Sequence, residues 1–167
     1  QTVFAREAGS VAAPTASLHF DAPALERMAA RGVEIARLTL HVGRGTFLPV
    51  TAATLAAHAM HAESFTIPEG LEAAVAACRA RGGRVVAAGS TVCRALEAWA
   101  LGERDSTRLL IAPGHSWRVV DALLTNFHTP RSTLLALVAA FAERGGAPDG
   151  LACVKAAYAE AVARRYS

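Results

Sequence analysis

The segment from Val119 to Phe141, VVDALLTNFHTPRSTLLALVAAF, constrains the fold of this chain more than any other. Residues 119–124 are apolar apart from Asp121, which predicts a short buried strand. The run that begins at Ser132 is apolar on nearly every side, which predicts a deeply buried helix. Pro130 fixes its own φ and favours an extended path for the two residues before it. A polar loop is therefore expected between two buried elements.

This loop, residues 125–131, is dense in groups that donate, accept or titrate, among them Asn126 and His128. It leads into a helix that Ser132 or Thr133 can cap. A polar loop directed at a helix N-terminus is a natural place to hold a polar or anionic ligand. The alternative is that Asn126 and His128 only satisfy loose backbone groups.

Strand and helix signals alternate along the rest of the chain. Strand patterns occupy residues 17–20, 33–42, 84–88 and 108–112; helix patterns follow Asp21 and Pro68 and occupy residues 51–62, 91–99 and 151–166. Such alternation predicts an α/β fold with a mostly parallel or mixed sheet and flanking helices. We expect one α/β domain over residues 1–167.

A second polar loop, Gly89-Ser90-Thr91, also lies between a predicted strand and a predicted helix. Because α/β sheets bind ligands at the carboxyl ends of their strands, two such loops at one edge could embrace one ligand. Gly43-Arg44-Gly45 supplies a flexible loop after another strand, but a lone GxG is a weak signal and no GxGxxG follows.

His58, His61 and Glu63 form the most metal-like cluster in the sequence. On the predicted helix the two imidazoles are spaced i, i+3, with the carboxylate just beyond. A closed zinc site needs four ligands and an open one needs three, and neither a nearby cysteine nor an HExxH motif completes the set. We predict no metal, and solvated or mutually hydrogen-bonded histidines instead.

Composition excludes some classes of protein and leaves others open. The net charge is +3 and nearly all of the 17 basic residues are arginine, which permits nucleic-acid binding without requiring it. No apolar run reaches the ~18 residues that a membrane span needs. The cysteines are far apart and form no CxxC pair, so we expect a reducing cytoplasm. A monomer is favoured.

Several blocks together resemble one family. LHVGRGTFLPV at 40–50, HAMHAE at 58–63, GSTVCRALE at 89–97 and the segment 119–141 look like the S-adenosylmethionine:tRNA ribosyltransferase-isomerases of queuosine biosynthesis, and AREAGSVAAPTASLHF at 5–20 fits the same family. The blocks come in the family's order and cover most of the chain. The resemblance implies an α/β domain that carries an inserted small β-barrel.

The chain departs from the family pattern in several places. We expect the N-terminal region, the barrel and the C-terminal Tyr-Gly-Asp-Ala-Met block to be missing, so that residues 1–167 are a fragment of the catalytic domain. The loop after Trp99 is short, and residues 145–154 resemble an insertion. The absence of the first two parts would bear on whether this chain acts alone.

The resemblance implies a specific reaction. The family transfers the ribosyl moiety of S-adenosylmethionine, a co-substrate, to 7-aminomethyl-7-deazaguanine at the tRNA wobble position. The ribose rearranges, epoxyqueuosine-tRNA forms, and adenine and methionine are released. The expected partners are S-adenosylmethionine and tRNAs with a GUN anticodon, and the expected compartment is the cytoplasm. No metal and no membrane are expected.

The chemistry of this reaction suggests roles for residues in the blocks. The sulfonium acidifies the ribose 5′-carbon, so a neutral imidazole (His128, His58 or His61) suits the base. Glu63 or Asn126 suits the departing adenine, and Asp121 or Glu97 suits the aminomethyl cation. The expected substrate-binding residues are His41, Gly43, Gly45, Thr46, Ser90, Thr91, Arg94, Arg131, Ser132 and Thr133. Arg131, Arg94 and Arg44 are expected along one RNA-docking edge.

Two other functions remain open. A non-catalytic RNA-binding relative could keep the scaffold without turnover, and an unrelated α/β transferase could act on a small phosphorylated ligand. Binding of S-adenosylmethionine separates the second of these from the family enzyme.

Overall fold

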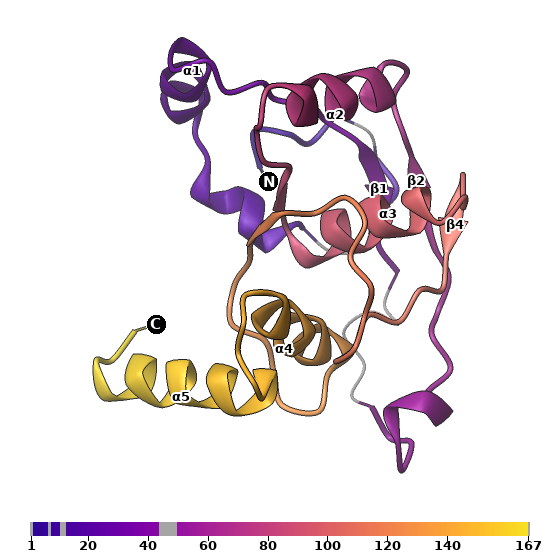
Figure 1. Cartoon of the computed structure of the whole chain (residues 1–167), viewed down its shortest axis with the longest axis vertical. Helices are drawn as coiled ribbons and strands as arrows, with labels where there is room; N and C mark the ends of the chain where they lie inside the picture. Colours follow the sequence, from indigo (N-terminus) through magenta and orange to yellow (C-terminus); the bar gives the residue numbers. More distant parts are fainter. Residues whose placement is uncertain (1, 7, 11–12, 44–49, 167) are drawn as a thin grey trace.

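Two small sheets organise the chain in the computed structural model, which describes residues 2–6, 8–10, 13–43 and 50–166 (Figure 1). The antiparallel sheet has the order β1-β2-β4, formed by Thr39–His41, Glu63–Thr66 and Ser106–Thr107. The second sheet is a parallel pair of β3 (Val86–Ala88) and β5 (Ala122–Leu124), in which Ala88 lies opposite Leu124. The expected α/β class is confirmed, with the strands divided between two sheets.

Helices surround both sheets. They are α1 (Ala22–Ala30), α2 (Leu71–Ala80), α3 (Ser90–Ala100), α4 (Thr133–Arg144) and α5 (Gly150–Ala163), with the 3-10 helices η1 (Thr15–His19) and η3 (Leu55–Ala57). In Figure 1, α3 lies beside the antiparallel sheet while α4 and α5 form a pair at the bottom. None of the helices in the described part of the chain combines the length and apolar character needed to cross a membrane.

Side-chain caps fix where three helices begin. Asp21 accepts the N–H of Ala24 at 2.7 Å, and Asp149 accepts the N–H of Ala152 at 2.9 Å. Ser132 caps α4 by accepting the N–H of Leu135 at 3.2 Å. Each capping oxygen satisfies an N–H group that has no partner within its own helix. The caps expected at Asp21 and Ser132 are confirmed.

The main core lies between α3, α4 and the parallel strand pair. Its fully buried residues include Ala87 of β3, Cys93 of α3, and Ile111 and Val120 of the segment that precedes β5. Burial, reinforced by the neighbouring Glu97 carboxylate, raises the pKa of the Cys93 thiol. Cys93 is therefore a packing residue and not a nucleophile, because only the thiolate is reactive.

Close backbone packing joins α4 to α5. A Cβ atom at Gly150 would overlap the carbonyl group of Ala139 on α4, so only glycine fits at the first residue of α5. Val154 on the next turn of α5 is also buried. This contact places α5 close to the loop that leads into α4.

Several predicted elements are shorter than expected or have another form. Residues 17–20 were expected as a strand, but they belong largely to η1. The helix predicted over residues 51–62 is wrong, because only Leu55–Ala57 is helical and His58 is already extended. The strand predicted at 108–112 is instead β4 at Ser106–Thr107. Gly45 and Thr46, and with them Arg44, lie outside the described residues.

Candidate active site

The two polar loops predicted from the sequence meet at one sheet edge. β3 and β5 run parallel, so Gly89 and Thr125 both follow carboxyl ends of strands. The N–H of Gly89 donates to the carbonyl of Leu124 at 2.8 Å. Gly89 has a φ of 114°, which side chains rarely tolerate, and it offers no side-chain cap to α3. The first N–H groups of α3, beginning at the buried Ser90, therefore start at this edge.

His128 is held in place from two sides. Its Nε2 lies 2.9 Å from Oγ1 of Thr125, and its backbone N–H donates to Oη of Tyr158 at 2.7 Å. Partial burial lowers the pKa of the imidazole below 6.5. The ring is therefore neutral at pH 7 and able to accept a proton, as the sequence argument requires of a base.

Asn126 lies against η1, a segment far away in the sequence. Its Nδ2 is 3.1 Å from Nε2 of His19, a residue 107 positions earlier in the chain. The other amide atom, Oδ1, is buried, and no described residue gives it a hydrogen bond. The site thus includes His19, which the sequence argument did not single out. The only signal for it was the block at 5–20, to which no role had been assigned.

Tyr158 of α5 is the second residue that sequence reasoning missed. Its hydroxyl accepts the N–H of His128, and its ring packs edge to face with Phe127, with 4.8 Å between the ring centroids. Phe127 itself is 57% exposed. The last helix of the described chain therefore supports the loop from outside, through a residue that the sequence presents as one apolar position of an amphipathic helix.

The end of the loop is tied to α4 and to residue 50. Ser132 Oγ donates to the carbonyl of Thr129 at 2.8 Å while it caps the helix, so this hydroxyl has two backbone partners. Arg131 is exposed, has a φ of 55°, and accepts the N–H of Val50 at 2.7 Å through its carbonyl. Thr133 is buried. Of these three predicted ligand contacts, Arg131 alone exposes its side chain.

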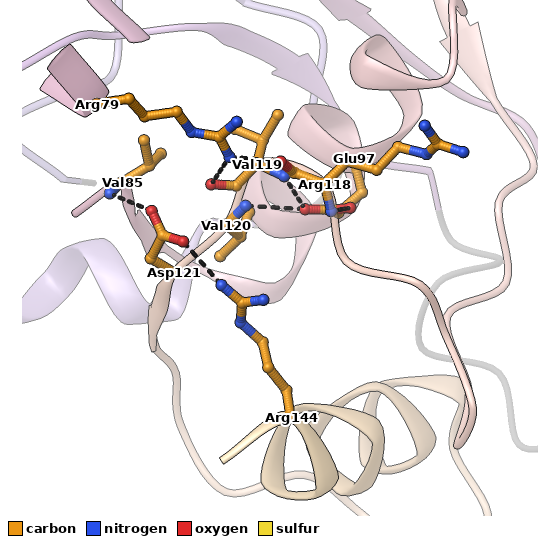
Figure 2. Close-up of polar contacts among 8 residues, drawn as sticks. All are labelled: Arg79, Val85, Glu97, Arg118, Val119, Val120, Asp121 and Arg144. Carbon is orange, nitrogen blue, oxygen red and sulfur yellow. Dashed lines mark hydrogen bonds and ion pairs between the residues drawn. The ribbon is translucent and has the colours of Figure 1, made fainter. Parts of the chain in front are cut away.

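Behind the loop, a buried carboxylate fixes the chain that leads into β5 (Figure 2). Glu97 is completely buried and accepts the backbone N–H groups of Arg118, Val119 and Val120 at 2.8–2.9 Å. His115 approaches the same carboxylate at 3.3 Å. Charge-assisted bonds of this kind are among the stronger ones in proteins. Glu97 therefore has a structural role, which replaces the expected contact with a substrate cation.

Asp121 has structural partners as well. Figure 2 shows its carboxylate between the backbone of Val85 and the side chain of Arg144, at distances of 3.0 Å and 2.7 Å. It therefore joins β3, β5 and α4 before the loop begins. The expected role of Asp121 at the aminomethyl group is not supported by this arrangement, since both of its oxygens are engaged.

Arg94 and Glu63 form an ion pair inside the molecule, between α3 and β2. Their side chains are only 4% and 6% exposed. Burial lowers the pKa of Arg94 to about 10. The expectation that Arg94 lies on an exposed RNA-docking edge is wrong, because this arginine is buried against Glu63 of β2. The apolar pattern of α3 alone does not reveal this partner. The same pairing places Glu63 beside Arg94 and not beside Asn126.

The remaining predicted site residues lie elsewhere. His58 and the exposed His61 occupy the extended stretch before β2, not one helical face. His41 belongs to β1, and its ring borders Gly9, while Gly43 is exposed beyond the strand. Thr91 is half-buried in the first turn of α3. Within the described ranges, no three His, Cys, Asp or Glu side chains converge as they would around a metal ion.

An arginine-rich hollow of about 490 Å³ opens between α2 and the end of α3, lined in part by Arg79, Arg104 and Arg118. Arg79 donates to the carbonyl of Arg118, and Arg104 donates to the carbonyl of Trp99 at 3.0 Å. Both helices end here, where their carbonyl groups favour cations. Two of the arginines therefore satisfy backbone groups, and the hollow lies away from the loop of His128.

Comparison with known proteins agrees with the resemblance seen in the sequence. The family described as "Queuosine biosynthesis protein" matches residues 1–167 in full. The chain belongs to this queuosine biosynthesis family. A relative from Thiobacillus denitrificans, named S-adenosylmethionine:tRNA ribosyltransferase-isomerase, is 54% identical over 99% of this chain and 48% of its own length. One of the same name from Sorangium cellulosum is 58% identical over 86% of this chain and 41% of its own length.

The fold of this queuosine-family chain also matches a solved structure. The crystal structure of S-adenosylmethionine tRNA ribosyltransferase from Thermotoga maritima has a TM-score of 0.69 and 37% identity, over 90% of this chain and 47% of that one. The chain thus spans about half the length of the relatives that it matches.

Proposed function

We propose that this chain forms the catalytic α/β part of an S-adenosylmethionine:tRNA ribosyltransferase-isomerase. The whole protein would transfer and isomerise the ribosyl moiety of S-adenosylmethionine onto 7-aminomethyl-7-deazaguanine at the wobble position of tRNAs with a GUN anticodon. The products would be epoxyqueuosine-tRNA, adenine and methionine. The reaction would take place in the cytoplasm.

The observation that carries this proposal is the meeting of two loops at the carboxyl ends of β3 and β5. α3 begins at the Gly89 turn, and the loop of residues 125–131 presents a neutral imidazole at the same sheet edge. Ligands of α/β proteins bind at such an edge. The names of the relatives indicate that the ligands at this edge are S-adenosylmethionine and tRNA.

Within this site the structure favours His128 as the base. A neutral imidazole is suited to removing the acidified proton on the ribose 5′-carbon, and its partners Thr125 and Tyr158 orient the ring and the backbone. Asn126, with its unpartnered amide atom, is suited to bind the departing adenine. The first N–H groups of α3, which have no partner within their own helix, suit an anionic group such as the methionine carboxylate.

For tRNA, Arg131 is the described arginine of the loop whose side chain is exposed. Chemistry on a wobble base requires the nucleotide to be splayed from its stack, with the flanking phosphates held at the rim of the site. We assign this rim to Arg131. The exposed ring of Phe127 belongs to the same loop, four positions before Arg131, and aromatic faces of this kind stack on splayed bases.

The direct test uses the protein at its full natural length. It is incubated with S-adenosylmethionine and a tRNA that carries the 7-aminomethyl-7-deazaguanine precursor, and the nucleosides are analysed by mass spectrometry. The expected product is epoxyqueuosine, with one adenine released for each modified tRNA. The matched controls are tRNA that carries unmodified guanine at the wobble position and the His128→Ala variant, which we expect to be slower by at least ~100-fold.

Two outcomes would contradict the proposal. If the wild-type protein binds the tRNA and S-adenosylmethionine without forming product, a non-catalytic RNA-binding relative is the better description. If it binds no S-adenosylmethionine, the function belongs to another class of α/β transferase. A His128→Ala variant with a normal rate and a lower melting temperature would leave the enzyme intact and assign this histidine to structure.

A further inference from the structure

The strongest feature without an assigned role is the contact between His19 of η1 and Asn126 of the loop of residues 125–131. Nε2 of His19 lies 3.1 Å from the amide nitrogen of Asn126, across 107 residues of sequence. His19 is exposed, so a bound molecule can reach its ring. No role follows for it from the sequence blocks or from the names of the relatives.

The position of His19 is built into the fold. Ala16 and Ser17 of η1 are buried, and the Cβ of Ala16 lies 3.9 Å from where a Cβ at Gly89 would stand. η1 therefore rests on the turn between β3 and α3, at the same sheet edge as the loop of residues 125–131. His19, at the last position of η1, is delivered to the candidate site by this packing.

One of the two polar atoms of the Asn126 amide is buried without a hydrogen-bond partner among the described residues. Its nitrogen faces His19, whereas its buried oxygen receives no hydrogen bond from the described residues. If the amide group turns by about 180°, its oxygen accepts a hydrogen bond from His19, and its nitrogen takes the buried position. An amide can thus pair with a neutral imidazole or with an imidazolium. In both orientations the amide keeps its hydrogen bond to His19 and so holds the imidazole ring.

We propose that His19, oriented by Asn126, is the proton donor to the adenine that leaves S-adenosylmethionine. This inference rests on the proposed function. Nε2–H of the imidazolium donates to Asn126, and Nδ1–H delivers its proton to a ring nitrogen of adenine as the C1′–N9 bond breaks. The electron pair of that bond stays with the base, so neutral adenine departs and His19 is left neutral. His128, which lies on the same loop as Asn126, has the opposite proposed role, the removal of a proton from the ribose.

The test measures adenine release by the full-length protein with precursor tRNA, for wild type and for His19→Gln. Glutamine keeps the capacity for a hydrogen bond with Asn126 but cannot act as an acid. With S-adenosylmethionine we expect release to fall by at least ~100-fold, the usual low end for loss of an acid–base group. The matched control is Arg27→Gln, which changes another exposed side chain, on α1, and should leave the rate within about twofold.

A second substrate separates catalysis from structure. An analogue of S-adenosylmethionine with 8-azaadenine carries a base that leaves more easily without protonation. The gap between wild type and His19→Gln should therefore shrink by ~10-fold or more with this analogue. An equal gap with both substrates, or no loss with either, overturns the proposal. Absence of turnover in the wild type would instead refute the proposed function itself, so the two failures are distinct.

Discussion

At the scale of single residues, two acidic groups that the sequence offers as ligand contacts have become parts of the frame. Glu97 and Asp121 both bind backbone N–H groups around the start of β5. A buried N–H group without an acceptor costs about 1–3 kcal/mol of stability. Removal of such a carboxylate therefore destabilises the fold, because it leaves buried N–H groups without a hydrogen bond.

We therefore expect Glu97→Ala to lower the free energy of unfolding by about 3–5 kcal/mol, since it leaves three backbone N–H groups without their acceptor. Urea denaturation of the purified protein measures this. Glu69→Ala is the matched control, because Glu69 is exposed, and it should change stability by no more than about 0.5 kcal/mol. A loss below about 1 kcal/mol for Glu97→Ala would contradict the role assigned to this carboxylate.

His128 gives a prediction about pH. Burial lowers its pKa in the folded state, so the unfolded chain takes up a proton first as the pH falls. Its contribution to stability is therefore complete above pH 6.5 and is lost as the pH falls from 6.5 toward the lower pKa of the folded state. In denaturation curves at pH 7.5 and pH 5.5, His128→Gln should lose less stability on acidification than wild type. An identical loss in both proteins would show that this histidine does not titrate as proposed.

At the scale of elements, the sequence predicts the helices better than the strands. α1 and α4 have side-chain caps, all four helices α1 to α4 have apolar periods and are followed by a glycine, and each lies close to its predicted place. Residues 51–62 are similarly rich in alanine and other apolar residues, yet only Leu55–Ala57 is helical. Local apolar periodicity is not enough to form a helix, because most helical stability in proteins comes from tertiary packing. Strands of three residues are set by their pairing partners, which a local pattern cannot reveal.

The packing of α4 against α5 depends on one residue without a side chain. Gly150→Ala introduces a methyl group that overlaps the backbone of Ala139, so the helices must separate. We expect a loss of about 2–4 kcal/mol, measured by thermal or urea denaturation. Gly43→Ala is the control, because a Cβ at that position meets nothing within 4 Å. An unchanged stability for Gly150→Ala would mean that α5 does not sit as described.

At the scale of the whole molecule, the two sheets are joined through the interior by Arg94 and Glu63. Arg94 belongs to α3, which connects with the parallel pair, and Glu63 belongs to the antiparallel sheet. A buried pair of this kind adds little net stability over apolar residues, but loss of one partner is costly because it strands the other charge.

A double-mutant cycle tests this link. Arg94→Met alone should destabilise the fold by about 3–5 kcal/mol, and the double variant Arg94→Met with Glu63→Leu should recover much of that loss. Denaturant unfolding gives all four values.

For RNA binding, the salt dependence of tRNA affinity should be unchanged in Arg94→Met, whereas Arg131→Ala should reduce the log–log slope by about 0.7–0.9. Additive losses in the cycle, or a reduced slope for Arg94→Met, would contradict the assignment of Arg94 to the interior.

The candidate site could be predicted in part. The loop of Asn126 and His128 and its meeting with the Gly89 turn follow from strand-loop-helix signals that are local in sequence. His19 and Tyr158 could not be found in this way, because each reaches the loop through tertiary packing of a distant element. Arg94 was misplaced for the same reason. Arg94 is on α3 and its partner Glu63 is on β2, and no local sequence pattern around either residue predicts this pair.

The support that Tyr158 gives to His128 has a consequence for how the protein is made. His19 is synthesised before the Gly89 turn and the loop, and Tyr158 is synthesised after all three. Contacts across such separations in sequence form late in folding, because the entropy of closing long loops must be met first. The loop therefore acquires its final geometry only after α5 has been synthesised and has docked. Until then the backbone N–H of His128 lacks the acceptor that Tyr158 supplies, so this part of the loop is not yet held in its final position.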